Sequence, residues 1–424
     1  MNTARWRAAL RMARRQTWHA KGRSLLVIAL IGLPVFALAG ADIAYRTWQL
    51  SPTEKLSRAI GTADAGIEWA GGPVQQGPGG YLKYQWSTVG DTNAPQPSTA
   101  QLRAQLPAGS RVISSDQSTQ GAEVRTPAGL EYASMTGLDY GDPIARGIVT
   151  PDGGRAPRTD GEAAITSTLA AKADLHVGST LKLVDTGHLP DPNWTFTVVG
   201  IVRDSGYRHA ETVYVRSSAV QAPTAQDASW PGSTTWLVDS PGPITWHEVL
   251  RLHTLGYVVT SRQVYLHPPP AGEIAYNSGG SGIDKQALSI ATLIVGMALL
   301  EVVLLAGPAF AVGARRQRRH LALVASAGGR SSDLRNIVLS NAIVLGVVSG
   351  LVSIVLAVVG MAIGIPTLGS LVDQVPGRFD VRPGELELLA LVEVFIALAA
   401  AAFPARGAAR MDVVVVLAGS GEKA

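Results

Sequence analysis

Four long apolar stretches divide a chain that is otherwise mixed in polarity. A helix needs about 20 largely apolar residues to cross a lipid bilayer, and each stretch reaches or approaches that length. The pattern therefore predicts four membrane-spanning helices, over residues 25–45, 287–312, 337–365 and 388–403.

The segment between the first two stretches, residues 46–286, has a different pattern. Short runs rich in β-branched residues alternate with turn residues, which is typical of strands. A helix capped by Ser167 or Thr168 is predicted to end before Gly178. Residues 71–100, rich in Gly, Pro and Gln, are expected to form an exposed loop. The strands are expected at Ala163–Thr166, Thr180–Val184, Thr195–Arg203, Val213–Val215 and Val258–Val264. This segment is therefore predicted to be an α+β domain.

The composition argues against a uniformly water-soluble enzyme. Hydrophobic residues make up 46% of the chain and charged residues 16%, whereas soluble domains carry about 25% charged residues. The chain contains no cysteine. This excludes disulfides, thiolate chemistry, and cysteine-ligated zinc or iron–sulfur clusters.

Basic residues are grouped at three places, in residues 1–24, in residues 313–336 and after the fourth stretch. Because basic loops are retained in the cytoplasm, we expect both termini and the 313–336 segment inside, and the 46–286 domain outside. Residues 1–24 are predicted to form a basic amphipathic helix at the inner membrane surface. The net charge of +4 then needs no nucleic-acid partner.

A cleaved secretory signal is the alternative for the first apolar stretch. The small residues Ala39–Ala41 are similar to a cleavage site. Tyr45 and Trp48 follow at the depth expected for interfacial aromatic anchors, however, and they favour an uncleaved span.

No catalytic constellation is visible in the sequence. His209 near Glu211, or His188 near Asp185 and Asp191, could be drawn as a metal site, but solvated loop residues explain them more simply. The chain is therefore expected to be a non-catalytic subunit without a cofactor or metal of its own. A hydrolase in the outer domain is the alternative.

Two acidic residues, Glu301 and Glu393, lie inside predicted spans. An acidic side chain at a span centre costs roughly 2.5–3.5 kcal/mol, so we expect each to face the bundle interior. A protonated or hydrogen-bonded contact between helices is favoured over a functional path. The pairs Gly346/Gly350 and Gly360/Gly364 predict close helix packing.

Two motifs carry a resemblance to a known family. A basic amphipathic segment follows the second stretch, with Leu321 and Val324 on one helical face and a Gly328–Gly329 turn. After the fourth stretch the chain reads Pro404-Ala-Arg406-Gly-Ala-Ala-Arg410-Met-Asp412. At these residues the chain resembles the FtsX-like, MacB-type permeases of ABC transporters, and residues 161–203 are similar to that family's periplasmic domain. The chain resembles actinobacterial members, which often carry two such blocks where this chain carries one.

The resemblance implies a membrane protein with a four-span α-helical bundle and a large α+β extracytoplasmic domain inserted between spans one and two. The permease domain would cover residues 287–417, followed by a cytoplasmic tail over residues 418–424. The protein would lie in the plasma membrane. It would form a dimer, either with a second copy of itself or with a similar permease.

The resemblance also implies a separate cytoplasmic ATPase that docks on residues 313–336. The sequence contains no G-x-x-x-x-G-K-[ST] phosphate loop, so ATP would be bound by the partner. The implied function is export or extraction of an unidentified substrate. The alternative is a membrane-anchored sensor or regulator that binds a ligand or controls a cell-wall hydrolase without transport. The residues implied in ATPase coupling are Arg315, Arg316, Arg318, Arg319, Leu321, Leu323, Val324, Gly328 and Gly329.

Overall fold

The computed structural model describes residues 21–89, 94–118, 122–184, 194–220, 232–274, 276 and 331–409, with seven isolated positions between 289 and 304. The chain separates into two compact units. The helical unit comprises Met1–Trp48, Ile283–Thr367 and Arg378–Ala424, and the globular unit comprises Gln49–Gly282 and Leu368–Gly377.

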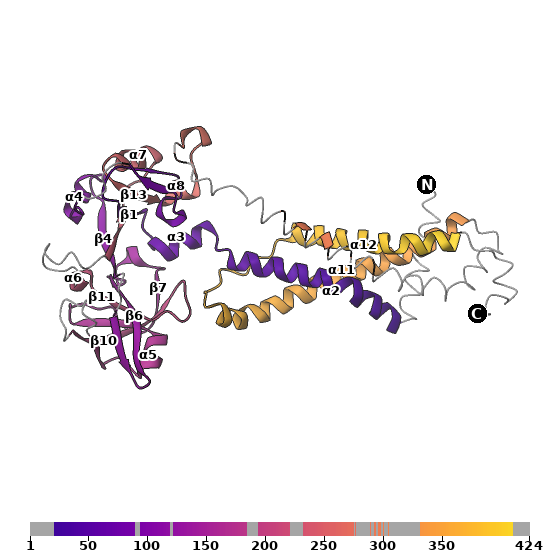
Figure 1. Ribbon diagram of the computed structural model, residues 1–424, viewed down its shortest axis with the longest axis horizontal. Helices are drawn as coiled ribbons and strands as arrows, with labels where there is room; N and C mark the ends of the chain where they lie inside the picture. The colour runs from indigo at the N-terminus through magenta and orange to yellow at the C-terminus, as the bar shows by residue number, and fades with distance from the viewer. Residues whose placement is uncertain are drawn as a thin grey trace. The chain divides into compact units, whose positions relative to one another are not determined.

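Long helices make up most of the described part of the helical unit (Figure 1). They are α2 (Lys21–Trp48), α11 (Ser331–Val372) and α12 (Pro383–Ala409). Ile31 of α2 packs with Leu345 of α11 and Ala397 of α12 in one buried cluster. A second cluster, which includes Ile43, Ala357 and Leu386, joins the same helices further along. Apolar side chains therefore hold the three helices together at two levels.

The expectation of a four-span bundle is wrong for this structure. Within the described residues, two helical stretches are long and apolar enough to cross a membrane, Ile28–Ile60 and Arg335–Thr367. Helix α12 is not among the helices that meet this criterion within the described residues. The expected span 287–312 lies almost wholly outside the described residues. What the structure shows is two membrane-length helices and a large α+β body.

The globular unit consists of strands with short helices between them. The strands are β1 (Ala65–Trp69), β2 (Val74–Gln76), β3 (Trp86–Thr88), β4 (Arg111–Ser118), β5 (Ala122–Thr126), β6 (Gly129–Leu138), β7 (Val149–Gly154), β8 (Glu162–Thr166), β9 (Thr180–Val184), β10 (Thr195–Asp204), β11 (Thr212–Val215), β12 (Gly232–Asp239) and β13 (Tyr257–Ser261). The helices are α3 (Pro52–Ile60), α4 (Thr99–Ala104), α5 (Ser167–Ala173), α6 (Ser217–Val220), α7 (Trp246–Thr254) and α8 (Arg262–Leu266), with 3₁₀ turns η1 (Gly80–Lys83), η2 (Pro143–Ala145) and η3 (Ala271–Glu273).

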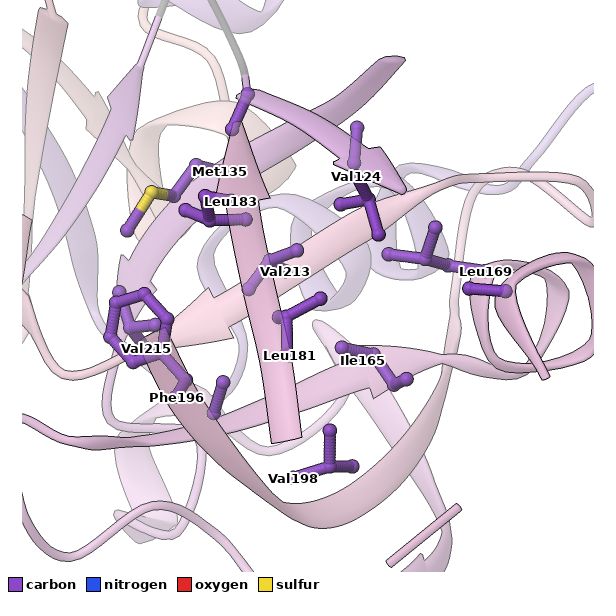
Figure 2. Packing of buried hydrophobic residues seen from close by; sticks show 14 of the residues in the cluster. Val124, Met135, Ile165, Leu169, Leu181, Leu183, Phe196, Val198, Val213 and Val215 are labelled. Atoms are coloured by element: carbon purple, nitrogen blue, oxygen red, sulfur yellow. The ribbon is translucent and has the colours of Figure 1, made fainter. Parts of the chain in front are cut away.

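Six strands close into a ring in the order β11-β8-β10-β9-β5-β6. Closure depends on the parallel pairing of β11 with β6, which aligns Val213 with Met135. The interior is filled by side chains from all six strands and from α5, including Ile165, Leu181 and Phe196 (Figure 2). The ring is therefore a packed core, as expected for a small barrel.

The sheet continues from β6 through β4, β12 and β1 to β13. Alternation along β12 divides its side chains between two cores, since successive residues of a strand point to opposite faces. Trp236 and Val238 join a cluster that includes residues of α4 and α7. Leu237 joins a cluster with Leu56 and Ile60 of α3 on the other face. The extended sheet is thus covered on both faces.

The strands predicted between residues 163 and 215 are confirmed, each to within one residue at either end. Helix α5 is also confirmed, although its N-cap is Thr166 and not Ser167 or Thr168. Of the strand expected over 258–264, the first part lies in β13 and the remainder forms α8.

The expectation of an exposed loop over residues 71–100 is wrong. This segment contains β2, η1 and β3 and begins α4. Gln76 is 2% exposed, and its amide bonds both main-chain groups of Val259, at 2.7 Å to the carbonyl and 2.8 Å from the N–H. The side-chain amide of Gln76 thus makes the two hydrogen bonds to Val259 that a neighbouring strand would otherwise make.

Candidate functional site

Three of the residues singled out from the sequence lie in the described part of the chain, Glu393, Pro404 and Arg406, all within α12. Arg406 is exposed. The other positions lie outside the described residues. They are Glu301, Arg315, Arg316, Arg318, Arg319, Leu321, Leu323, Val324, Gly328, Gly329, Arg410 and Asp412.

The carboxyl group of Glu393 is enclosed in the helical unit. Its side chain is 0% exposed, and among the described residues neither carboxyl oxygen has a hydrogen-bond partner. The hydroxyl of Ser349 on α11 lies beside the carboxyl group, but it donates to the main-chain carbonyl of Ile28 on α2 at 2.9 Å. The side chain of Glu393 is therefore buried where α12 meets α2 and α11.

Two glycines allow the helices to approach this carboxyl group. A Cβ built on Gly32 of α2 would lie 2.5 Å from Ser353 Oγ, 2.7 Å from Ser349 Oγ and 3.8 Å from Glu393 Oε1. A Cβ on Gly350 of α11 would lie 3.1 Å from Glu393 Oε2. Small residues at helix contacts permit this close approach. We call Gly32, Ser349, Gly350, Ser353 and Glu393 the polar seam.

Gly346 extends this contact by one turn. A Cβ there would lie 3.1 Å from Ala397 Cβ and 3.2 Å from Val394 Cα of α12. The close packing predicted for the Gly346/Gly350 pair is therefore confirmed, and the surface that it contacts belongs to the same chain.

The second candidate region is in the globular unit, where Leu368–Gly377 lies although its neighbours in the sequence belong to the helical unit. We call this segment the strap. Gln374 forms an antiparallel bridge with Tyr207. On either side of the bridge, Arg208 N–H donates to the Asp373 carbonyl at 3.0 Å, and Val375 N–H donates to the Gly206 carbonyl at 2.9 Å. Residues 373–375 of the strap, which follow the end of α11, are therefore held by a β-bridge with a main-chain hydrogen bond on either side.

Side chains fix both ends of this bridge. The Asp373 carboxylate accepts from the main-chain N–H of His209 at 2.7 Å and lies 2.8 Å from His209 Nδ1. The Arg58 guanidinium, on α3, donates to the carbonyls of Val375 at 2.7 Å and Pro376 at 2.9 Å. A cation therefore holds the main chain of the strap against α3.

The strap also contributes to a pocket of about 670 Å³. Three arginines line it, Arg58, Arg203 and Arg208. The Asp204 carboxylate is engaged within the fold, by the N–H groups of Gly206 and Tyr207 and by the Tyr214 hydroxyl. The pocket is therefore lined by polar side chains, two of which are already engaged, Arg58 by the strap carbonyls and Arg203 by Asp152 at 3.4 Å. The remaining lining residues are Glu54, Ser57, Gly147, Thr150, Ser167, Ser205, Tyr207, His209 and Val375.

Of the two possible metal sites drawn from the sequence, the one at His209 and Glu211 serves other contacts, whereas His188, Asp185 and Asp191 lie outside the described residues. Glu211 Oε1 lies 2.6 Å from Lys172 Nζ, whereas His209 faces Asp373. Within the described residues, no group of three or more His, Asp or Glu side chains could hold a metal ion. The sequence carries no signal for the His209–Asp373 pair, because 164 positions separate the two residues.

No family model matches the chain, and a search of curated proteins finds no match. Among solved structures, the chain is similar to a crystallised domain of a candidate permease protein from Porphyromonas gingivalis. The identity is 13% and the TM-score 0.30, over 47% of this chain and 91% of that chain.

Proposed function

We propose that this chain is the membrane permease subunit of an ABC transporter, and that it transmits ATP hydrolysis by a separate cytoplasmic ATPase to its globular unit. The strap is the observation that carries the proposal. The connection between α11 and α12 is bound into the globular unit by main-chain hydrogen bonds and by Arg58. A rigid connection of this kind can pass a helix displacement to the globular unit.

The sequence resemblance supplies the other end of this path. In the proposal, the ATPase docks on residues 313–336, with Leu321, Leu323 and Val324 in the contact, and the partner binds the ATP. The basic residues 1–24 lie at the cytoplasmic membrane surface. The chain acts with a second permease, identical or similar, in exporting or extracting a substrate.

Copurification tests the partner. We expect an ABC ATPase to copurify with the chain from native membranes, and Leu323→Asp to reduce that yield at least tenfold. Ser420→Asp, in the tail outside the proposed docking segment, is the control and should leave the yield unchanged. Failure to recover any ATPase with the unmodified chain would contradict the proposal and favour a membrane-anchored sensor.

A fluorescent label tests transmission. The chain has no cysteine, so Tyr132→Cys, at an exposed position of β6, gives a single labelling site. ATP should change the label's emission in the reconstituted complex, and an ATPase that binds but cannot hydrolyse ATP should abolish repeated change. An ATPase that turns over with no response at the globular unit would refute transmission.

A further inference from the structure

We propose that Glu393 is a proton-binding site, whose proton permits α2, α11 and α12 to pack around the polar seam. The argument rests on the environment of one carboxyl group and does not depend on the proposed function. Glu393 is 0% exposed, and neither of its oxygens accepts a hydrogen bond from the described residues. An ionised carboxylate in this position would be buried without solvation or compensation, which proteins avoid.

No counter-charge faces the carboxyl group from its own helix. On α12, Glu387 lies six residues earlier, about 9 Å along the axis, and is exposed. Arg406 lies thirteen residues later, about 20 Å along the axis. Glu385, nearer the start of α12, forms an ion pair with Arg46. None of these groups can neutralise Glu393.

Among the described residues of α2 and α11, no counter-charge lies at this level either. The charged positions of α2 closest to Gly32 in the sequence are Arg23 and Asp42, about 14 Å and 15 Å along the helix. Asp42 pairs with Arg46. On α11, Arg335 lies fifteen residues before Gly350, about 22 Å along the axis. Within the described chain, the groups that face Glu393 are hydroxyls and glycines, so a proton is the ligand that neutralises it.

The seam geometry couples this proton to helix packing. The hydroxyl groups of Ser349 and Ser353 lie close to Gly32 of α2, and Gly350 lies close to Glu393 Oε2. The three helices can keep this close approach when the carboxyl group is neutral. Loss of the proton would create a charge that requires water, and water can enter only when the helices separate. Packing should therefore be retained at low pH and lost as the pH rises.

Infrared spectroscopy of the full chain in lipid tests for the proton directly. A carboxylic C=O stretch that persists at neutral pH is expected in the unmodified chain and in Glu387→Gln, and its intensity should be lost in Glu393→Gln. Glu387→Gln is the matched control, because Glu387 is an exposed acid on the same helix. If Glu393→Gln leaves this band unchanged, the proposal is overturned.

Crosslinking tests the coupling to packing. Gly40 and Met361 lie two turns from Gly32 and Ser353 on the same helices, and a Cβ on Gly40 would lie 3.7 Å from Met361 Cγ. We would introduce Gly40→Cys and Met361→Cys in this cysteine-free chain. Relative to the same pair with Glu393→Gln, crosslinking with the native Glu393 should fall at least threefold between about pH 5 and pH 10.

Crosslinking yield is expressed as the ratio of the chain with native Glu393 to the chain with Glu393→Gln. Because thiol reactivity changes with pH equally in both, this ratio removes its contribution. Identical profiles in the two backgrounds would overturn the coupling. If Glu393→Gln does not fold, Glu393→Leu, which is also uncharged, provides the same comparison.

Discussion

At the scale of single residues, burial determines the protonation state of His253. It lies on α7, is 4% exposed, and packs edge-on against Trp246 with ring centroids 6.0 Å apart. Its Nε2 has no hydrogen-bond partner among the described residues. Burial lowers the pKa of His253 to about 4 from the ordinary value of 6.5. The folded globular unit therefore holds this side chain neutral.

This lowered pKa predicts acid sensitivity. The pKa of His253 is lower in the folded than in the unfolded state, so the unfolded state binds a proton first as the pH falls. The free energy of unfolding should therefore be unaffected by this residue above pH 6.5 and should decrease as the pH falls toward 4. The loss should approach about 3 kcal/mol. His253→Phe should flatten this part of the stability profile, measured by urea unfolding at a series of pH values. His247→Gln, at an exposed position of α7, should leave the profile unchanged.

A tight turn gives a second residue-scale prediction. Gly61 has φ of +63°, and a Cβ there would lie 2.2 Å from the Ile144 carbonyl oxygen. Side chains other than glycine are strained in this backbone region, and the obstacle is main chain that cannot rotate away. Gly61→Ala should lower the melting temperature of the globular unit by several degrees. Gly242→Ala, with nothing within 4 Å, is the control, and equal melting temperatures for the two variants would contradict this account.

At the scale of elements, the edge of the sheet beside β13 depends on a side chain. Gln76 satisfies both main-chain groups of Val259, while β2 pairs only with β3 among the strands. Buried main-chain groups are costly when they are left unpaired. The amide of Gln76 therefore links β2 to β13 by two hydrogen bonds.

Gln76→Leu should destabilise the globular unit by on the order of 3 kcal/mol, because two buried main-chain groups lose their partners. Thermal or urea unfolding followed by tryptophan fluorescence measures the change. Gln75→Leu alters an exposed position on the same strand and should stay within about 0.5 kcal/mol of the unmodified chain. Similar losses in both variants would show that the strand, and not the amide, is what matters.

At the scale of the whole molecule, the strap brings together segments that are far apart in the sequence. Arg58 precedes the carbonyl groups that it binds by 317 and 318 residues. In the proposed function, this contact keeps the globular unit attached to the connection between α11 and α12. Its loss should therefore separate ATP hydrolysis from movement of the globular unit.

Arg58→Gln should raise hydrogen exchange at the amides of residues 373–375 at least tenfold, because the strap loses two hydrogen bonds to a cation. In the reconstituted complex, ATP turnover should continue while the response of the label at position 132 is lost. Arg125→Gln, at an exposed position of β5, is the control. Unchanged exchange in Arg58→Gln would mean that the main-chain bridge alone holds the strap.

Local patterns in the sequence were sufficient for several features. The strands between residues 163 and 215 were predictable, because β-branched runs bounded by turn residues specify extended backbone locally. The approximate positions of α2, α11 and α12 followed from apolar length. The burial of Glu393 followed from the position of one acid within an apolar stretch. Each of these features depends on residues that are near one another in the chain.

The tertiary structure alone decided the rest. Closure of the barrel requires β11 to pair with β6, and folding of the strap requires Asp373 to reach His209. Gln76 lies 183 residues from the strand that it completes. In each contact, the partners are distant in sequence and are brought together by the packing of whole helices and strands. Local composition therefore does not predict them. The four-span prediction was wrong, because two helices among the described residues, and not four, are long and apolar enough to cross a membrane.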